Sequence, residues 1–205
     1  RSSLCSKAVT LIREAGFNLQ PLYIKLEKNI PLGGGLGGGS SDAAALLRLI
    51  ARDLLPKQIK NEQLYKLAQK IGADVPVCLM PDWQIITGTG TQKKPAPLPR
   101  SIDAPIYAVL ANPQIHLSTA EIFAQIDFYS AAELSQLKKF IASGALADII
   151  AISNDMAAPV CGKYPEIAAL IDHLNMPHDG FIGAGMSGSG ASCFALTKNK
   201  ASAEK

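Results

Sequence analysis

PLGGGLGGGSSDAA, from Pro31 to Ala44, is the most informative stretch of the chain, because six of the seven residues from Gly33 to Gly39 are glycine. Alternating apolar residues predict a half-buried strand before it, over 22–27, and apolar residues after it predict a helix over 43–55. So many glycines cost conformational entropy, and a mere linker would rarely stand between a strand and a helix. Backbone N–H groups of such a loop can surround an anion, and the following helix adds its own free N–H groups. We therefore interpret the stretch as a phosphate-binding loop, with a flexible hinge as the alternative.

The details of this loop exclude several known phosphate sites. Ser40 and Ser41 are expected to cap the helix and to offer hydroxyls to a phosphate or a metal. No lysine precedes them, which excludes the Walker A loop of P-loop NTPases. A dinucleotide-binding fold needs a strand that ends in an acidic residue about 20 residues later, and here Asp53 falls inside the predicted helix instead. The protein-kinase motifs H-R-D and D-F-G do not occur in the sequence.

Three further segments carry candidate chemistry. Asp74, in Gly-Ala-Asp-Val-Pro, is a lone carboxylate after a predicted helix, and it is either a turn residue that bonds nearby N–H groups or a catalytic group. Thr119 and Phe123 are either a helix-start threonine and a core phenylalanine or residues that face a ligand. A second glycine-rich run, Gly183 to Gly190, leads into a predicted strand over 192–197. Asn154-Asp155 precedes an apolar segment and is interpreted as a helix cap.

The remaining pattern mixes strands with helices and predicts mixed α/β layers. Pro-rich residues 94–105 suggest a connection between two domains. Ser118 and Glu121 predict a capping box before Ile122. Further expected elements are a helix from Ser3 to Gly16, a helix over 61–71 with Leu64, Leu67, Ala68 and Ile71 inward, strands over 85–91 and 106–110, the second of them buried, and helices over 131–142 and 165–174.

Composition limits the possible partners. The chain has 205 residues, 48% of them hydrophobic and 18% charged, so it can bury a core. Its net charge is only +3, and the densest basic spot, Lys93-Lys94, is interpreted as a solvated turn, so we expect no nucleic-acid partner. No apolar run is long enough to span a bilayer and no signal peptide opens the sequence. Four well-separated cysteines and three histidines without metal spacing indicate reduced thiols in a cytoplasmic protein and no Cys/His metal site.

The motifs described above, taken in their order along the chain, resemble those of the GHMP kinases. The proline, Gly-Leu-Gly and Ser-Ser pair of the first loop resemble the second motif of that family, and the extended form is similar to that of its diphosphocytidyl-methylerythritol kinases. The resemblance implies that Asp74 is the catalytic general base. It implies that Thr119 and Phe123 face a cytidine ring and that Gly188 and Ser189 lie beside the substrate. It implies that ATP is bound by Pro31, Gly33, Gly34, Gly35, Leu36, Gly37, Gly38, Gly39, Ser40 and Ser41.

The same resemblance implies an α+β fold with two domains. Residues 1–104 would form a ribosomal-S5-domain-2-like nucleotide domain that lacks its first strands, and residues 105–205 a ferredoxin-like domain. The chain opens at Arg1 rather than Met and is expected to be part of a longer protein, so the family's active-site lysine and Tyr-His pair cannot be placed; Lys7 is not assigned that role.

The implied reaction transfers the γ-phosphoryl group of ATP, with Mg²⁺, to the 2-hydroxyl of 4-diphosphocytidyl-2-C-methyl-D-erythritol, in isoprenoid precursor synthesis. The expected partner is this small cytidylyl substrate, and the protein is expected to be a monomer or weak homodimer. The alternatives are another GHMP kinase, of the homoserine or mevalonate type, or a nucleotide-binding regulator without catalysis.

Overall fold

The computed structural model describes residues 3–80, 84–87, 92–95, 105–126, 133–152, 154–176 and 180–204. The chain divides into two units, which are treated separately below. The first unit comprises residues 1–27 and 37–96, and the second unit comprises residues 28–36 and 97–205. Both contain helices and antiparallel strands, which confirms the predicted α+β class.

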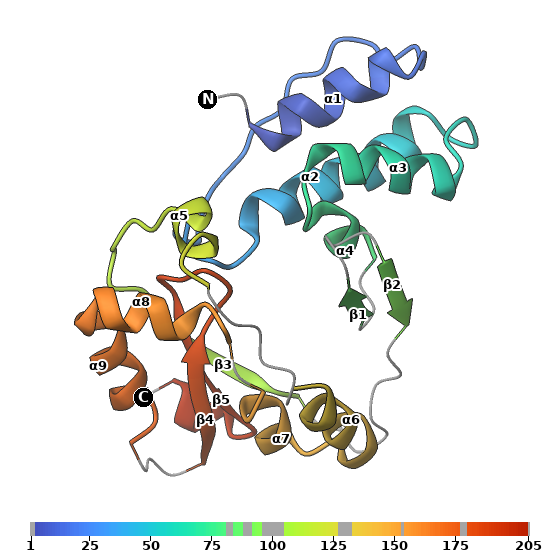
Figure 1. Ribbon diagram of the computed structural model, residues 1–205. Helices are drawn as coiled ribbons and strands as arrows, with labels where there is room; N and C mark the ends of the chain where they lie inside the picture. The colour runs from blue at the N-terminus through green and yellow to red at the C-terminus, as the bar shows by residue number, and fades with distance from the viewer. Residues whose placement is uncertain are drawn as a thin grey trace. The chain divides into compact units, whose positions relative to one another are not determined.

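Helices dominate the first unit (Figure 1). Its elements are α1 (Leu4–Glu14), α2 (Gly38–Leu49), the π-helical turn η1 (Ile50–Leu54), α3 (Asn61–Ile71), α4 (Val75–Leu79), β1 (Gln84–Thr87) and β2 (Gln92–Pro95). The predicted helix after the glycine loop is therefore present, but its last turn widens to η1 before Pro56. The residue before a proline is disfavoured in the α conformation, and Leu55 accordingly leaves it with φ −130° and ψ 53°.

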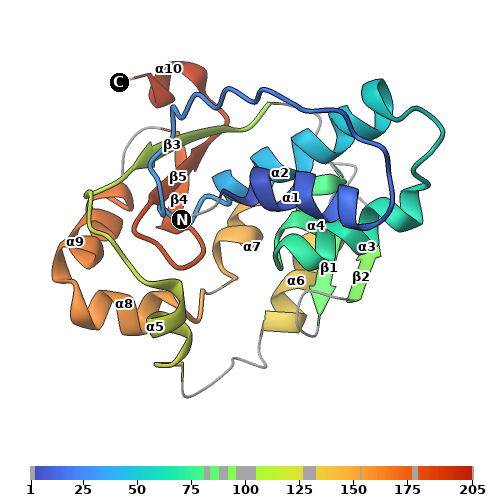
Figure 2. The same cartoon turned by 90° about the horizontal axis from the view of Figure 1, so that it is seen from above.

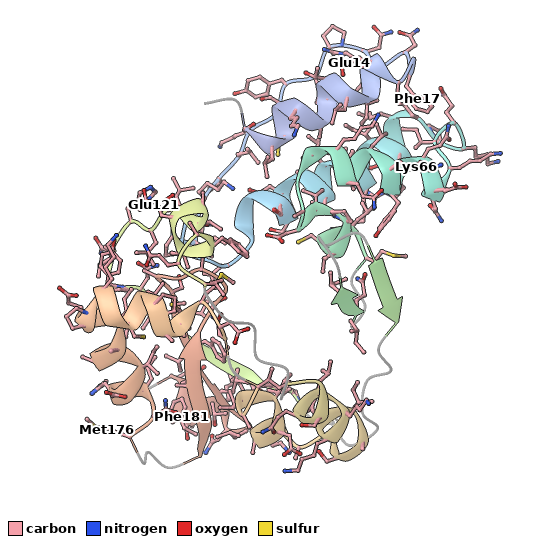
Figure 3. The ribbon with its side chains drawn as sticks, viewed as in Figure 1. Glu14, Phe17, Lys66, Glu121, Met176 and Phe181 are labelled. Atoms are coloured by element: carbon pink, nitrogen blue, oxygen red, sulfur yellow. The ribbon has the colours of Figure 1, made fainter. Side chains whose placement is uncertain are left out.

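The helices α1 and α3 form as their sequences predict. The hydroxyl of Ser3 accepts a hydrogen bond from the N–H of Ser6, and Ala8 and Ile12 of α1 are fully buried. The predicted inward residues of α3 are buried as well. They join one core with residues from α1, α2 and α4, and the partly buried Phe17, which follows α1, packs against it (Figure 3).

The strand predicted over 22–27 is absent, although the apolar residues alternate there. A strand is defined by hydrogen bonds to a neighbouring strand, and no described segment pairs with these residues. Tyr23 is 94% exposed. The alternation of apolar residues alone was therefore not sufficient to predict a strand here.

The strands β1 and β2 form an antiparallel hairpin, with Ile85 opposite Lys94 and Ile86 opposite Lys93. The strand predicted over 85–91 is thus present up to Thr87, and residues 88–91 lie outside the described part of the chain. The interpretation of Lys93-Lys94 as a turn is wrong, because both residues belong to β2.

An antiparallel sheet with the strand order β3-β5-β4 is the centre of the second unit (Figure 2). Its strands are β3 (Tyr107–Ala111), β4 (Phe181–Met186) and β5 (Cys193–Thr197). The strand over 106–110 is confirmed with a shift of one residue, but it is an edge strand and not a buried one: Leu110 is 53% exposed. In the described part of this unit, the sheet is accompanied by the helices α5 (Thr119–Phe123), α6 (Glu133–Ser143), α7 (Leu146–Ile150), α8 (Ala157–Lys163), α9 (Pro165–Leu174) and α10 (Lys200–Ala203).

The helices α7, α9 and α10 contact the sheet, and α10 does so at β3 and β5. The helix α9 lies against β4 and β5, and α7 lies against β4. At Gly183 the approach of α7 is so close that a Cβ atom would lie 2.6 Å from Cγ2 of Ile150. The second core gathers residues of this unit around Ile167, Met186 and Cys193. Burial there raises the pKa of the Cys193 thiol to about 11.

No helix among the described residues is long and apolar enough to cross a membrane.

Candidate active site

The first N–H groups of helix α2 have no hydrogen-bond partner inside the helix. Gly37, at the N-cap, has φ +65°, and no side chain caps the helix. The first intrahelical bond from this residue runs from the N–H of Ser41 to its carbonyl, so the N–H groups of Gly38, Gly39 and Ser40 have no partner inside the helix. These groups and the helix dipole favour an anion at this end.

The predicted serine cap is wrong. The helix begins at Gly38, which places Ser40 and Ser41 in its first turn. The hydroxyl of Ser41 donates a hydrogen bond to the carbonyl oxygen of Gly38 over 2.9 Å. The left-handed conformation at Gly37 allowed the helix to start earlier than the serines suggested, since glycine adopts positive φ without steric cost.

Asp74 occupies the N-cap position of the short helix α4, in the first unit. Its carboxylate caps no N–H group and has no hydrogen-bond or ion-pair partner among the described residues. The interpretation as a turn aspartate that bonds nearby N–H groups is therefore wrong. The backbone next to Asp74 is firmly packed, because Val75 and Pro76 are fully buried. Pro76 lies in the first turn of α4, where the N–H group that proline lacks would have no partner inside the helix.

The charge of Asp74 reaches the Cys78 thiol one turn further along α4. Burial raises the pKa of that thiol, the Asp74 carboxylate raises it further, and the Arg48 guanidinium lowers it. An exposed carboxylate without a partner remains available as a proton acceptor or as a ligand for a cation.

The first part of the glycine loop, up to Leu36, belongs to the second unit and is hydrogen-bonded there to the second glycine run and the residues after it. The hydroxyl of Ser187 donates to the carbonyl oxygen of Gly35 over 3.0 Å. The N–H of Ser192 donates to the carbonyl oxygen of Gly34 over 3.2 Å. Asn112 donates from Nδ2 to the buried hydroxyl of Ser192 over 2.8 Å. The part of the first glycine loop that belongs to this unit is thus hydrogen-bonded to a segment more than 150 residues away in sequence.

This close approach requires glycine. Gly35 has φ +74°, and a Cβ atom there would overlap the carbonyl oxygen of Ser187 and lie 2.8 Å from the amide nitrogen of Gly190. A Cβ atom on Gly188 would lie 2.9 Å from the carbonyl oxygen of Gly35. Real Cβ atoms do not approach backbone atoms so closely.

The sequence singled out Thr119 and Ser189 separately, and the structure brings them together. Their hydroxyls are hydrogen-bonded over 2.9 Å, and Ser189 is buried. Thr119 is the first residue of α5, whose N-cap is Ser118: the hydroxyl of Ser118 accepts from the N–H of Glu121, which is one of the two hydrogen bonds of the predicted capping box.

An open cavity of about 500 Å³ lies beside this pair in the second unit. Phe123 lines it and is 51% exposed, so the interpretation of Phe123 as a core residue is wrong. Gly188 lines it too, whereas Thr119 and Ser189 do not. Its other lining residues are Ile126, Asn154, Asp155, Met156, Met186, Ser187 and Phe194. An aromatic face beside a glycine loop is suited to stacking on a flat ring.

Asn154 lines this cavity and is hydrogen-bonded to the second glycine run, contacts that the sequence did not reveal. Its Nδ2 donates to the carbonyl oxygens of Met186, over 3.0 Å, and Gly188, over 2.8 Å, and its Oδ1 accepts from the N–H of Met156. The interpretation of Asn154-Asp155 as a helix cap is wrong, because α8 starts at Ala157 without a side-chain cap. The adjacent Asn-Asp pair was the available signal, but the carbonyls that Asn154 binds lie more than 30 residues away in sequence.

No cluster of three or more His, Cys, Asp or Glu side chains suited to a metal ion occurs within the described residues. A magnesium ion bound together with a nucleotide takes most of its oxygen ligands from phosphates and water and needs only one or two protein oxygens. The Ser40 hydroxyl and the Asp74 carboxylate are of the ligand type that such an ion prefers.

The chain is similar to known kinases over nearly its whole length. The GHMP kinases N terminal domain matches residues 3–81, and the GHMP kinases C terminal domain matches residues 135–205. A 4-diphosphocytidyl-2-C-methyl-D-erythritol kinase of Rhizobium etli is 39% identical over 98% of this chain, and one of Rhodopseudomonas palustris is 36% identical over 98%.

A solved structure agrees with these sequence matches. The crystal structure of a 4-(cytidine 5'-diphospho)-2C-methyl-D-erythritol kinase superposes with a TM-score of 0.74 at 29% identity, over 100% of this chain and 72% of the other. The present chain spans 66% of the length of the Rhizobium etli relative and 69% of that from Rhodopseudomonas palustris. It therefore covers about two thirds of a protein of this type.

Proposed function

Because the chain belongs to the 4-diphosphocytidyl-2-C-methyl-D-erythritol kinase family of the GHMP kinases, we propose that the full-length protein transfers the γ-phosphoryl group of ATP to the 2-hydroxyl of 4-diphosphocytidyl-2-C-methyl-D-erythritol. The observation that carries this proposal is the Asp74 carboxylate. It lies in the Gly-Ala-Asp-Val-Pro segment, is exposed on a firmly packed backbone, and has no partner among the described residues.

In the proposed reaction Asp74 accepts the proton of the substrate hydroxyl while the hydroxyl oxygen bonds to the γ-phosphorus. The bond between that phosphorus and the β–γ bridging oxygen breaks, and ADP leaves. A positioned general base typically contributes about 10²- to 10⁴-fold to a rate. The Ser40 hydroxyl would be a protein ligand of a bound Mg²⁺, and the ion would neutralise charge on the phosphates.

ATP is proposed to bind along the first glycine loop, through Pro31, Gly33, Gly34, Gly35, Leu36, Gly37, Gly38, Gly39, Ser40 and Ser41. The N–H groups at the start of α2 that have no partner inside the helix support this assignment, because the helix sets their direction before the nucleotide binds. The hydrogen bonds that hold Gly34 and Gly35 against the second glycine run support it too, since a phosphate cradle must be rigid.

The cytidine base is proposed to stack on Phe123, with Thr119, Gly188 and Ser189 beside it. The exposed aromatic face in a cavity and the Thr119–Ser189 hydrogen bond support this assignment. Stacking of a base on an aromatic side chain contributes about 1–3 kcal/mol to binding. We also propose that the domain boundary falls between residues 104 and 105.

The test is a substrate panel with the full-length protein. ADP release from MgATP would be followed with 4-diphosphocytidyl-2-C-methyl-D-erythritol, homoserine and mevalonate, and the phosphorylated position would be identified by phosphorus and proton NMR. We expect turnover with the cytidylyl substrate and a new phosphate on its 2-hydroxyl.

Turnover with homoserine or mevalonate alone would contradict the assigned substrate and the roles of Thr119 and Phe123. ATP binding without turnover of any of the three would contradict catalysis and favour a regulator.

A further inference from the structure

We propose that Arg48 is a positioning residue for Asp74, holding the helix that Asp74 begins against the helix that follows the glycine loop. This role rests on the proposed function, because it concerns the base of that reaction. Arg48 contacts no reacting atom in the proposal and acts through the backbone of α4.

The geometry starts from the last turn of α2. Nη1 of Arg48 donates hydrogen bonds to the carbonyl oxygens of Cys78, over 2.6 Å, and Leu79, over 3.1 Å. These are the last two residues of α4, and the final carbonyls of a helix have no partner inside it. A charged donor that satisfies two such carbonyls makes a stronger bond than a neutral one.

A second cation holds the other side of Asp74. Nζ of Lys7, in α1, donates to the carbonyl oxygen of Ile71 over 2.9 Å. Ile71 is the last residue of α3, so the segment Ile71–Leu79 is bound at both ends by side chains from neighbouring helices. Beneath it Val75 and Pro76 are fully buried.

The position of the Asp74 carboxylate therefore depends on its backbone. No hydrogen bond of its own orients the side chain within the described part of the chain. Without Arg48, the segment would still be held by Lys7, by the buried Val75 and Pro76 and by Gln84, whose Nε2 donates to the carbonyl oxygens of Val77 and Met80. The carbonyls of Cys78 and Leu79 would lose their charged donor, however, and the end of α4 is expected to shift. A displacement of about 1 Å of a catalytic group can lower a rate by about 10²-fold.

Arg48 also differs from its neighbour Arg52. Arg52 pairs with the carboxylate of Asp53 over 2.6 Å, at the surface. Arg48 makes no ion pair with a described carboxylate and uses its charge on backbone carbonyls instead. Surface ion pairs contribute little to stability, which makes Arg52 a suitable control for the loss of a positive charge.

The experiment compares Arg48→Met, Arg48→Lys and the control Arg52→Met in the full-length protein. We expect Arg48→Met to lower kcat about 10- to 100-fold, with the KM for ATP changed by less than about 2-fold, since the loop that binds ATP is untouched. Arg48→Lys should recover part of the loss, because an ammonium group can still reach one carbonyl. Arg52→Met should match the unaltered protein. All rates would be measured below the thermal unfolding range of each variant.

A double-mutant cycle separates positioning from simple stabilisation. The single-turnover rate constant would be measured for each variant. If Arg48 acts through Asp74, adding Arg48→Met to a protein that already carries Asp74→Asn should lower this rate constant only slightly. Equal costs in both backgrounds, or an unchanged kcat in a destabilised Arg48→Met protein, would overturn the positioning role. Absence of turnover in the unaltered protein would instead overturn the proposed function, and with it this role.

Discussion

Gly35 shows how much of the site depends on one missing side chain. Its φ of +74° is unfavourable for any residue with a Cβ atom, and the space that such an atom would fill is occupied by backbone atoms of Ser187 and Gly190. Backbone atoms cannot rotate away as a flexible side chain can, so the contact between the two glycine runs leaves no room for even one methyl group.

Gly35→Ala is therefore expected to lower the free energy of unfolding by at least about 2 kcal/mol, from the backbone conformation and the overlap together. It should also weaken ATP binding. The matched control is Gly162→Ala in α8, where a Cβ atom meets nothing within 4 Å and φ is not positive. That variant should be neutral or stabilised by up to about 1 kcal/mol. Urea denaturation of both variants, with equal losses in the two, would contradict this view of Gly35.

At the scale of elements, local signals predicted local structure well. The cap at Ser3, the spacing of Leu64, Leu67 and Ile71 and the proline at the start of α9 each act within a few residues. Those helices accordingly formed where expected. The prediction of a strand over 22–27 was wrong, because a strand forms hydrogen bonds to a neighbouring strand and the sequence of the segment itself does not show whether such a neighbour exists.

Asn154 illustrates an element held by distant partners. It joins the start of α8 to the second glycine run through three hydrogen bonds. Asn154→Asp keeps the shape and the acceptor for the N–H of Met156, but it places an oxygen against two carbonyl oxygens. We expect the free energy of unfolding to fall by about 1–3 kcal/mol, because two donors are lost. The KM for the cytidylyl substrate should rise.

Asn199→Asp is the matched control for this change. Asn199 accepts from the N–H of Ala201 over 2.9 Å, and an aspartate can accept that bond equally well. Thermal unfolding and substrate titration should therefore leave it unchanged. If the two aspartate variants behave alike, the donated bonds of Asn154 do not hold the loop.

At the scale of the whole molecule, the motifs predicted the GHMP kinase fold, which the two matched domains and the solved kinase confirm. They did not predict that Lys28–Leu36 belongs to the second unit while Gly37 belongs to the first. That division follows from contacts of Gly34 and Gly35 with Ser187 and Ser192, which no local pattern records. The roles of the site residues remain predictions for the same reason.

Asp74 is the residue on which the proposed activity of the whole protein depends. The most direct test compares the unaltered full-length protein with Asp74→Asn and with Asp172→Asn, a change to an exposed aspartate in α9. Phosphate transfer to 4-diphosphocytidyl-2-C-methyl-D-erythritol would be measured at saturating MgATP, and ATP affinity would be measured by calorimetry.

We predict that Asp74→Asn lowers kcat by about 10²- to 10⁴-fold while ATP still binds, because the amide cannot accept the hydroxyl proton. The Asp172→Asn protein should turn over normally. Near-full turnover by Asp74→Asn would contradict the account and remove Asp74 from the mechanism.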